Sequence, residues 1–148
     1  MKIYSHWLQG VLLAFLVWFG SIYAYDSYKS TIPASDFFTA KVEVPDMKVG
    51  DNSIIVYDRE IKKDFIGTFH AEIKSVENII TVCDGDGSGI KYDSSDKLDP
   101  SKVTLEWFIG KKCNLLPGQY YLETTWVINN ENWPTKYYTS ISNIFEVK

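Results

Sequence analysis

An uncharged segment near the amino terminus constrains this chain more than any other feature of its sequence. Residues 3–25 contain no Lys, Arg, Asp or Glu, and their apolar centre extends from Trp7 to Ala24. As an α-helix rising about 1.5 Å per residue, a segment of about 18 to 23 residues covers roughly 27 to 35 Å. The hydrocarbon core of a bilayer, about 30 Å thick, lies within this range. The segment predicts one transmembrane helix that contacts the lipid bilayer through residues 7–24.

Aromatic residues near the ends of this segment support an anchor that stays attached. Trp7 lies near one end, and Tyr23 and Tyr25 lie near the other, as in the aromatic belts of membrane proteins. The alternative is a secretory signal peptide that is cleaved after Ala24. Bulky aromatic residues disfavour cleavage there, so we expect residues 1–25 to form a signal-anchor.

The charges on either side of the segment predict its orientation. Lys2 precedes it and Asp26 follows it, and positive charge favours the cytoplasmic side. The larger C-terminal part is therefore expected outside the cytoplasm. The short Met-Lys start resembles bacterial and phage membrane proteins, which predicts the bacterial inner membrane and a periplasmic C-terminal domain.

The remainder of the chain has the composition of one folded domain. The 148 residues are 45% hydrophobic and 23% charged, with a formal net charge of −4. This balance argues against disorder. No basic stripe is present, so nucleic acid is excluded as a partner. Residues 26–36 are polar and contain Pro33, and we expect a short stalk there, followed by a domain over 37–148.

Short apolar runs alternate with turn residues after position 36, which predicts an all-β domain. Seven strands fit an antiparallel β-sandwich of two sheets. Alternation within two of them places Trp107 and Trp126 in the core. The strands are expected at 37–44, 53–57, 65–73, 79–83, 103–109, 119–128 and 138–147.

The last two strands carry a resemblance to a known family. The motif Pro-Gly-Gln-Tyr at 117–120 precedes an alternating strand, and the final strand includes residues 142–147. This arrangement is similar to the end of immunoglobulin-like domains in membrane-anchored surface proteins of bacteria and phage. In those domains the motif tyrosine pins the preceding turn. Antibody-type domains place a Cys two residues after this tyrosine, where this chain has Leu122. The resemblance implies an immunoglobulin-like β-sandwich and no activity.

The two cysteines, Cys83 and Cys113, both belong to the expected outer domain. In an oxidising periplasm they should form one disulfide. Closing a loop of roughly 31 residues would stabilise the domain by about 3.5–4 kcal/mol. His70 is the only histidine of the domain and is expected in the middle of a strand, which disfavours a catalytic thiol.

The string Asp-Gly-Asp-Gly-Ser-Gly at 84–89 is the most motif-like part of the chain. Oxygen atoms from Asp84, Asp86 and Ser88, followed by Gly89, match the start of a calcium loop. The twelfth position is Ser95, where calcium loops place a Glu. We therefore expect a flexible connection, with calcium binding as the weaker alternative.

A ten-residue connection between the last two strands, 129–138, contains Trp133, Tyr137 and Tyr138 among asparagines. Exposed aromatic residues on loops are typical of partner-binding surfaces. The alternative is that these side chains fold back as a lid on the end of the sandwich.

No catalytic motif is present in the sequence. We expect a non-catalytic, single-pass membrane protein that presents an immunoglobulin-like domain to the periplasm for protein or envelope interaction, with a phage-encoded factor as one setting. A structural subunit of an envelope or virion assembly is the first alternative. A secreted, calcium-stabilised binding domain is the second.

Overall fold

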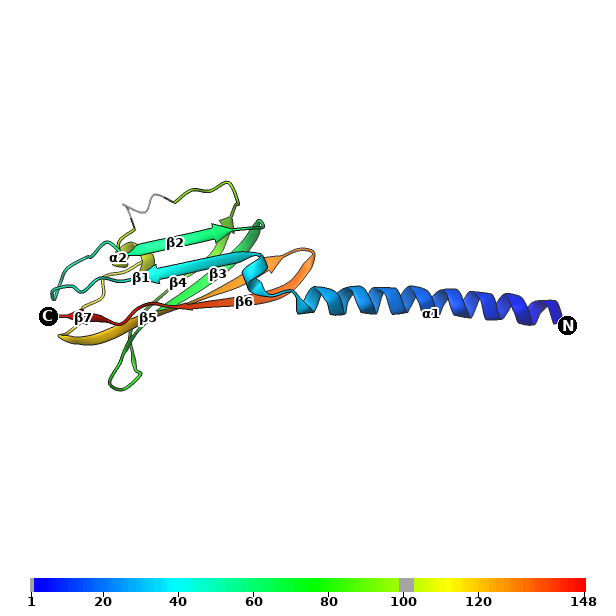
Figure 1. Ribbon diagram of the computed structural model, residues 1–148, viewed down its shortest axis with the longest axis horizontal. Helices are drawn as coiled ribbons and strands as arrows, with labels where there is room; N and C mark the ends of the chain where they lie inside the picture. Colours follow the sequence, from blue (N-terminus) through cyan, green and yellow to red (C-terminus); the bar gives the residue numbers. More distant parts are fainter. Residues whose placement is uncertain (1, 99–102) are drawn as a thin grey trace. The chain divides into compact units, whose positions relative to one another are not determined.

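The computed structural model describes residues 2–98 and 103–148, and the chain divides into two units at Pro33 and Ala34 (Figure 1). The first unit is α1 (Lys2–Thr31), a helix of 30 residues. Its segment Gln9–Thr31 is long and apolar enough to cross a membrane. The expected N-terminal apolar helix is therefore present.

Residues 26–31 of the stalk expected at 26–36 are helical, because α1 continues through Thr31. Ser30 and Thr31 donate side-chain hydrogen bonds to the carbonyls of Ser27 and Tyr28, each at 2.7 Å. Helices usually end before the residue that precedes a proline, and Pro33 ends this one. A short 3-10 helix, η1 (Ala34–Asp36), then begins the second unit.

The second unit contains two antiparallel sheets, which confirms the β-rich fold (Figure 1). The smaller sheet pairs β1 (Phe38–Glu43) with β2 (Val56–Ile61). The larger sheet has the order β4-β3-β5-β6, and β7 pairs with the first residues of β5. Its strands are β3 (Phe65–Ser75), β4 (Thr81–Tyr92), β5 (Gly118–Asn130), β6 (Trp133–Ile141) and β7 (Phe145–Val147).

The strand expected at 103–109 is wrong beyond its first residues. Ile54 and Thr104 form an antiparallel bridge, and Leu105 N donates to Ser53 O at 3.0 Å. The chain then turns into a short helix, α2 (Leu105–Ile109).

Local capping explains why α2 forms. Thr104 is the N-cap, and its hydroxyl accepts a hydrogen bond from Trp107 N at 3.2 Å. Gly110 ends the helix in the left-handed region, at φ 81°, and donates to Glu106 O. Helical geometry leaves Trp107 58% exposed, so the expectation of a core Trp107 is also wrong.

The final strand is interrupted where one continuous strand was expected. Between β6 and β7, the side chain of Asn143 accepts from Val44 N at 2.9 Å and donates to Val44 O at 2.8 Å. This amide replaces a backbone partner across the gap. Beyond it, Met47 N donates to Glu146 O at 2.9 Å, and Lys148 N donates to Met47 O at 3.0 Å. The free edge of β7 is thereby covered by a parallel segment.

The residues of the calcium-like motif lie inside β4, so the expected loop is wrong. Asp84 pairs with Glu72 and Asp86 pairs with His70 in the antiparallel register with β3. A Cβ atom at Gly85 would collide with the backbone carbonyl of Ile109 at the end of α2. The absence of a side chain at Gly85 therefore lets α2 lie directly against β4.

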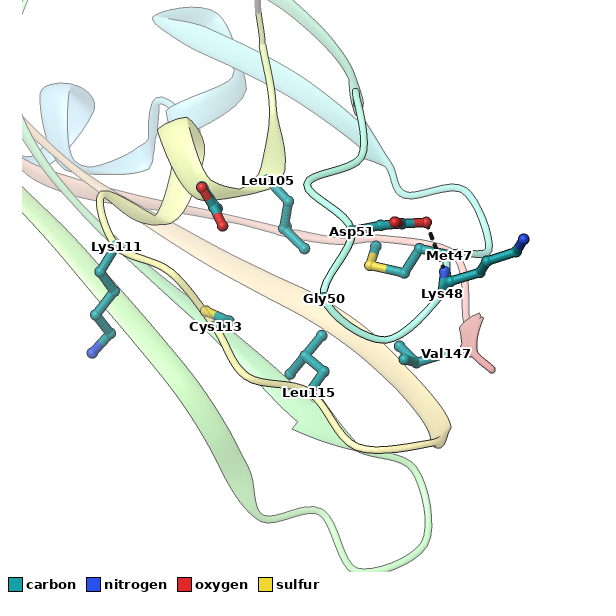
Figure 2. A pocket seen from close by; sticks show the side chains of 10 residues that line it. Met47, Lys48, Gly50, Asp51, Leu105, Lys111, Cys113, Leu115 and Val147 are labelled. Atoms are coloured by element: carbon teal, nitrogen blue, oxygen red, sulfur yellow. Dashed lines mark hydrogen bonds between the residues drawn. The ribbon is translucent and has the colours of Figure 1, made fainter.

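The disulfide expected between Cys83 and Cys113 is present, with the two Cα atoms 5.9 Å apart. It joins β4 to the segment that follows α2. Figure 2 shows Cys113 among Leu105, Leu115 and Met47 beside this segment. The bond and the close approach at Gly85 hold the same short helix against the same strand.

We expect Gly85→Ala to destabilise the domain by about 1–3 kcal/mol, because the new methyl group must push α2 away from β4. Asp86→Ala is the matched control on the exposed face of the same strand, and it should change stability by about 0.5 kcal/mol or less. Thermal and denaturant unfolding of the full chain measure both. A neutral Gly85→Ala, or a calcium-dependent stabilisation that Asp86→Ala removes, would contradict this assignment.

Candidate functional site

The structure separates the three aromatic residues expected in the connection at 129–138. Asn130 pairs with Trp133, so β5 and β6 are joined by a short turn and the ten-residue loop is wrong. Tyr137 remains 67% exposed on the outer face of β6. Of the three residues Tyr137 alone is exposed, and partner binding by them stays a prediction.

Trp133 and Tyr138 instead pack against the domain, as the lid alternative describes. The ring of Trp133 lies 5.5 Å from that of Phe37, edge to face. Tyr138 contacts Phe38 at 5.7 Å, and its hydroxyl donates to Ala40 O at 3.2 Å. Both tyrosine and tryptophan thus close the gap between β1 and β6 at one end of the domain.

Trp133→Ala should destabilise the domain by about 2 kcal/mol, since it removes the edge-to-face contact with Phe37. Tyr137→Ala removes an exposed aromatic side chain four residues later and should change stability by about 0.5 kcal/mol or less. Thermal unfolding compares the two variants. Equal effects would refute the lid, because only one of these rings packs inward.

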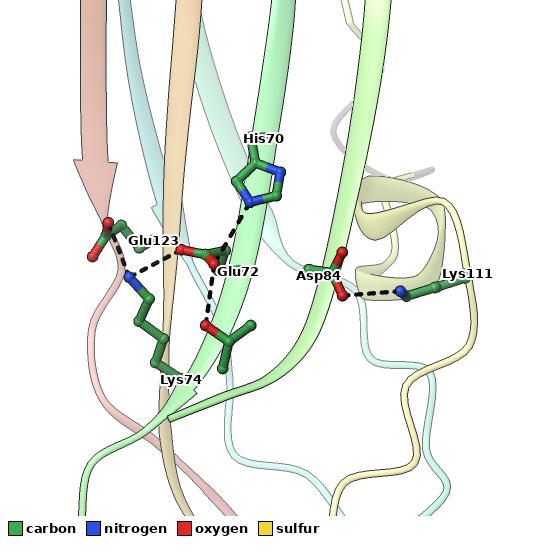
Figure 3. A network of polar contacts seen from close by, with 7 residues as sticks. His70, Glu72, Lys74, Asp84, Lys111 and Glu123 are labelled. Atoms are coloured by element: carbon green, nitrogen blue, oxygen red, sulfur yellow. Dashed lines mark hydrogen bonds and ion pairs between the residues drawn. The ribbon is translucent and has the colours of Figure 1, made fainter. Parts of the chain in front are cut away.

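A polar network covers part of the outer face of the larger sheet (Figure 3). Lys74 Nζ lies 3.0 Å from a Glu72 oxygen and 3.1 Å from a Glu123 oxygen. Thr81 donates to Glu72 at 3.1 Å, and His70 Nε2 lies 3.6 Å from the same carboxylate. The Lys74–Glu123 ion pair joins β3 to β5 and the hydrogen bond from Thr81 to Glu72 joins β4 to β3, so the network stabilises the pairing of three strands.

The calcium candidates do not converge on a cation. Asp84 pairs with Lys111 Nζ at 3.1 Å (Figure 3), and Asp86 and Ser88 are exposed along β4. Among the described residues, no group of three or more His, Cys, Asp or Glu side chains could hold a metal ion. The motif therefore has a structural explanation in strand pairing and the approach of α2.

The hydrogen bond from Lys74 lowers the pKa of Glu72 below its ordinary value near 4.5. A lowered pKa in the folded state contributes stability above pH 4.5, and this contribution is lost as the pH falls through the folded-state pKa. We expect Glu72→Gln to cost about 0.5–1 kcal/mol at neutral pH. The difference from the unsubstituted chain should shrink toward pH 3.

Denaturant unfolding between pH 3 and pH 7 measures this dependence. Glu77→Gln is the control, because Glu77 is an exposed carboxylate in the turn after β3. It should lower stability by about 0.2 kcal/mol or less at every pH. A deficit of Glu72→Gln that persists at pH 3 would show that the ion pair is not its cause.

The cavity beside the disulfide is too small for a ligand. It holds about 10 Å³ and is lined by Met47, Leu105, Cys113, Leu115 and Val147 among others (Figure 2). This is about the space of one water molecule. The hydrogen bond from Lys48 N to Asp51 Oδ2, at 3.1 Å, closes the neighbouring turn.

A hollow of about 340 Å³ lies over the turn between β5 and β6. Its walls are mostly polar side chains of the turn, together with Asp64 and Lys91, and Asn130 uses its side chain to donate to Asp64 O at 3.0 Å. This hydrogen bond fixes the turn to the segment that contains Asp64, so the polar turn residues stabilise the hairpin. The hollow is therefore a weaker candidate for a ligand site than the aromatic pocket described next.

An aromatic pocket of about 320 Å³ is the candidate functional site. Pockets for small ligands begin at about 300 Å³ and combine apolar walls with a few polar groups. Elements from both sheets and α2 supply the walls. The aromatic residues are Tyr57, Phe69, Tyr92, Trp107, Phe108 and Trp126, and the charged residues are Arg59, Lys91 and Asp96.

The pocket walls are held by ring contacts. Tyr57 stacks parallel to Trp126, with an interplanar angle of 7° and centroids 6.4 Å apart. Phe108 of α2 meets the edge of Tyr57 at 5.0 Å. Burial raises the pKa of Tyr57 well above its ordinary value of 10, and burial likewise raises that of Tyr92. Both phenols therefore remain protonated hydrogen-bond donors at neutral pH.

No known protein family, curated protein sequence or solved structure matches this chain. The pocket is consequently assigned from its own geometry. Its lining residues come from positions far apart in the sequence, between residues 57 and 126. The alternation of apolar and polar residues within one strand does not show that residues of different strands lie together, so the sequence did not predict this pocket.

Proposed function

We propose that this protein is a single-pass protein of the bacterial inner membrane, with a periplasmic domain that acts as a non-catalytic binding module. The observation that carries the proposal is the disulfide between Cys83 and Cys113 in a domain that follows a helix of membrane-spanning length. Structural disulfides persist in oxidising compartments, and the periplasm is one. The charges that flank the apolar segment of α1, Lys2 before it and Asp26 after it, also favour a periplasmic C-terminal domain.

We also propose that the domain is immunoglobulin-like. The order β4-β3-β5-β6 corresponds to C′-C-F-G in a variable-type domain, with β1 and β2 in the opposite sheet. Tyr120 donates from its hydroxyl to Leu116 O at 2.9 Å, as the tyrosine corner of such domains does. These two features support the assignment.

The pocket favours binding over catalysis. Six of its eleven lining residues are aromatic, and apolar or aromatic walls with a few polar anchors are the usual means of holding a ligand. Tyr57 and Tyr92 hold their protons tightly because their pKa values are raised by burial. Neither phenol is suited to act as a general base at neutral pH.

A structural subunit of an envelope assembly is the second candidate function. Ile79 and Ile80, in the turn between β3 and β4, are 70% and 58% exposed. Ile79 also has a φ of 59°, which is uncommon for a β-branched residue. An exposed apolar turn of this kind is suited to permanent contact with a neighbouring protein.

The state of the two thiols tests the topology. When the full chain is expressed in a bacterial host and alkylated after denaturation without reductant, we expect no alkylated thiol, because a periplasmic domain is oxidised. Expression in a host that lacks its periplasmic disulfide-forming oxidase is the control and should yield two alkylated thiols. Two alkylated thiols in the ordinary host would place the domain in the cytoplasm.

Membrane attachment is tested on the same preparation. The full chain should remain in the membrane after alkaline extraction, and Leu13→Arg with Leu16→Arg should release it, since each charge at the helix centre costs about 2.5–3.5 kcal/mol. An amino terminus at Tyr25 in the mature protein would contradict the anchor.

A further inference from the structure

The only arginine of the chain faces inward. Arg59 is the single Arg among the 15 basic residues. Along β2, Tyr57 is buried, Asp58 and Glu60 are exposed, and Arg59 is half-buried on the same side as Tyr57. Its guanidinium carbon lies 5.9 Å from the ring centre of Tyr57 and 5.7 Å from that of Tyr92. The cation is thus held over two aromatic rings of the pocket wall.

Within the part of the chain that the structure describes, the charge of Arg59 is not paired with a carboxylate. Its Nε atom is buried and has no hydrogen-bond partner. No ion pair joins Arg59 to a carboxylate among residues 2–98 and 103–148. The charged lining residues are two cations, Arg59 and Lys91, and one carboxylate, Asp96, and Lys91 Nζ lies 3.4 Å from Asp93 outside the lining. A half-buried cation without a counter-ion favours an anion in the adjoining space.

Resting on the proposed binding function, we propose that this pocket binds a small planar aromatic carboxylate, with its ring against the aromatic walls and its carboxylate paired with Arg59. The volume of about 320 Å³ has room for one or two fused rings. The guanidinium presents paired donors that match the two oxygens of a carboxylate. Trp107 is 58% exposed and part of the lining, so its indole adds aromatic surface that a ligand can reach.

Other ligand chemistries use less of this pocket. A neutral aromatic compound would leave the guanidinium without a counter-ion, and an aliphatic acid would leave most of the ring surface unused. Tyr57 and Tyr92, which also line the pocket, each carry a phenolic hydroxyl that is able to donate a hydrogen bond to an acceptor such as a carboxylate. An aromatic carboxylate satisfies the rings, the cation and the donors together.

A matched pair of probes tests the ligand class by ¹⁹F NMR, with the full chain in detergent micelles and empty micelles as the blank. The probes are 6-fluoro-2-naphthoate and the corresponding neutral carboxamide. We expect the carboxylate to bind at least about tenfold more tightly than the amide, because only the carboxylate forms a charge-assisted pair.

Arg59→Gln should weaken binding of the carboxylate by about tenfold or more and leave the amide unchanged. Trp107→Ala, at a lining position that is 58% exposed, should weaken both probes equally. Lys41→Gln removes a positive charge from β1, outside the pocket, and should change neither affinity. Unfolding temperature and the intact disulfide confirm that each variant is folded.

Two results would overturn the inference. One is equal affinity for the two probes in the unsubstituted chain, or no binding of either. The other is carboxylate binding that Arg59→Gln leaves unchanged. Neither result affects the membrane topology, which the thiol assay decides independently, so failure of the ligand class is distinguishable from failure of the proposed function.

Discussion

The contact between Phe38 and Trp126 is the interaction on which the rest of the domain depends. Their ring centres are 5.1 Å apart, and the two side chains are 0% and 1% exposed. Phe38 belongs to the smaller sheet and Trp126 to the larger one, so this pair holds the two layers together. Trp126 also stacks on Tyr57 at the pocket wall. The pocket is therefore an extension of the packed core.

The pocket exists because the smaller sheet stops early. Residues 53–55 pair with the segment that begins at Val103, but this pairing ends at Leu105, where α2 begins. In the described part of the chain, β2 consequently pairs along its length with β1 alone. Phe108 of α2 lies 5.0 Å from the ring of Tyr57 of β2, and both residues line the pocket. Local capping at Thr104 thus shapes the site.

Elements that depend on a pattern over many residues could be predicted from the sequence. Elements that depend on a single contact could not. The apolar helix, most strands and the disulfide follow from charge, alternation and cysteine count. Alternation over 103–109 is compatible with a strand, but the capping by Thr104 and Gly110 decides for a helix. Gly85 reads as part of a loop because nothing local shows that Ile109 lies against it. The sequence did contain one sign of the pocket. Arg59 lies two residues after Tyr57, so alternation along a strand places both side chains on the same inward face.

Arginine suits position 59 better than lysine does, because the two cations differ in hydration and in shape. Elsewhere the chain uses lysine for its surface ion pairs, as at Lys41 and Lys148. A lysine ammonium is a compact, strongly hydrated charge, and it would lose that hydration over the rings of Tyr57 and Tyr92. A guanidinium is more weakly hydrated and stacks on aromatic faces, so it tolerates this position. The same planar group still presents donors along its edge. Arg59 can therefore rest on the pocket wall and remain available to an anion.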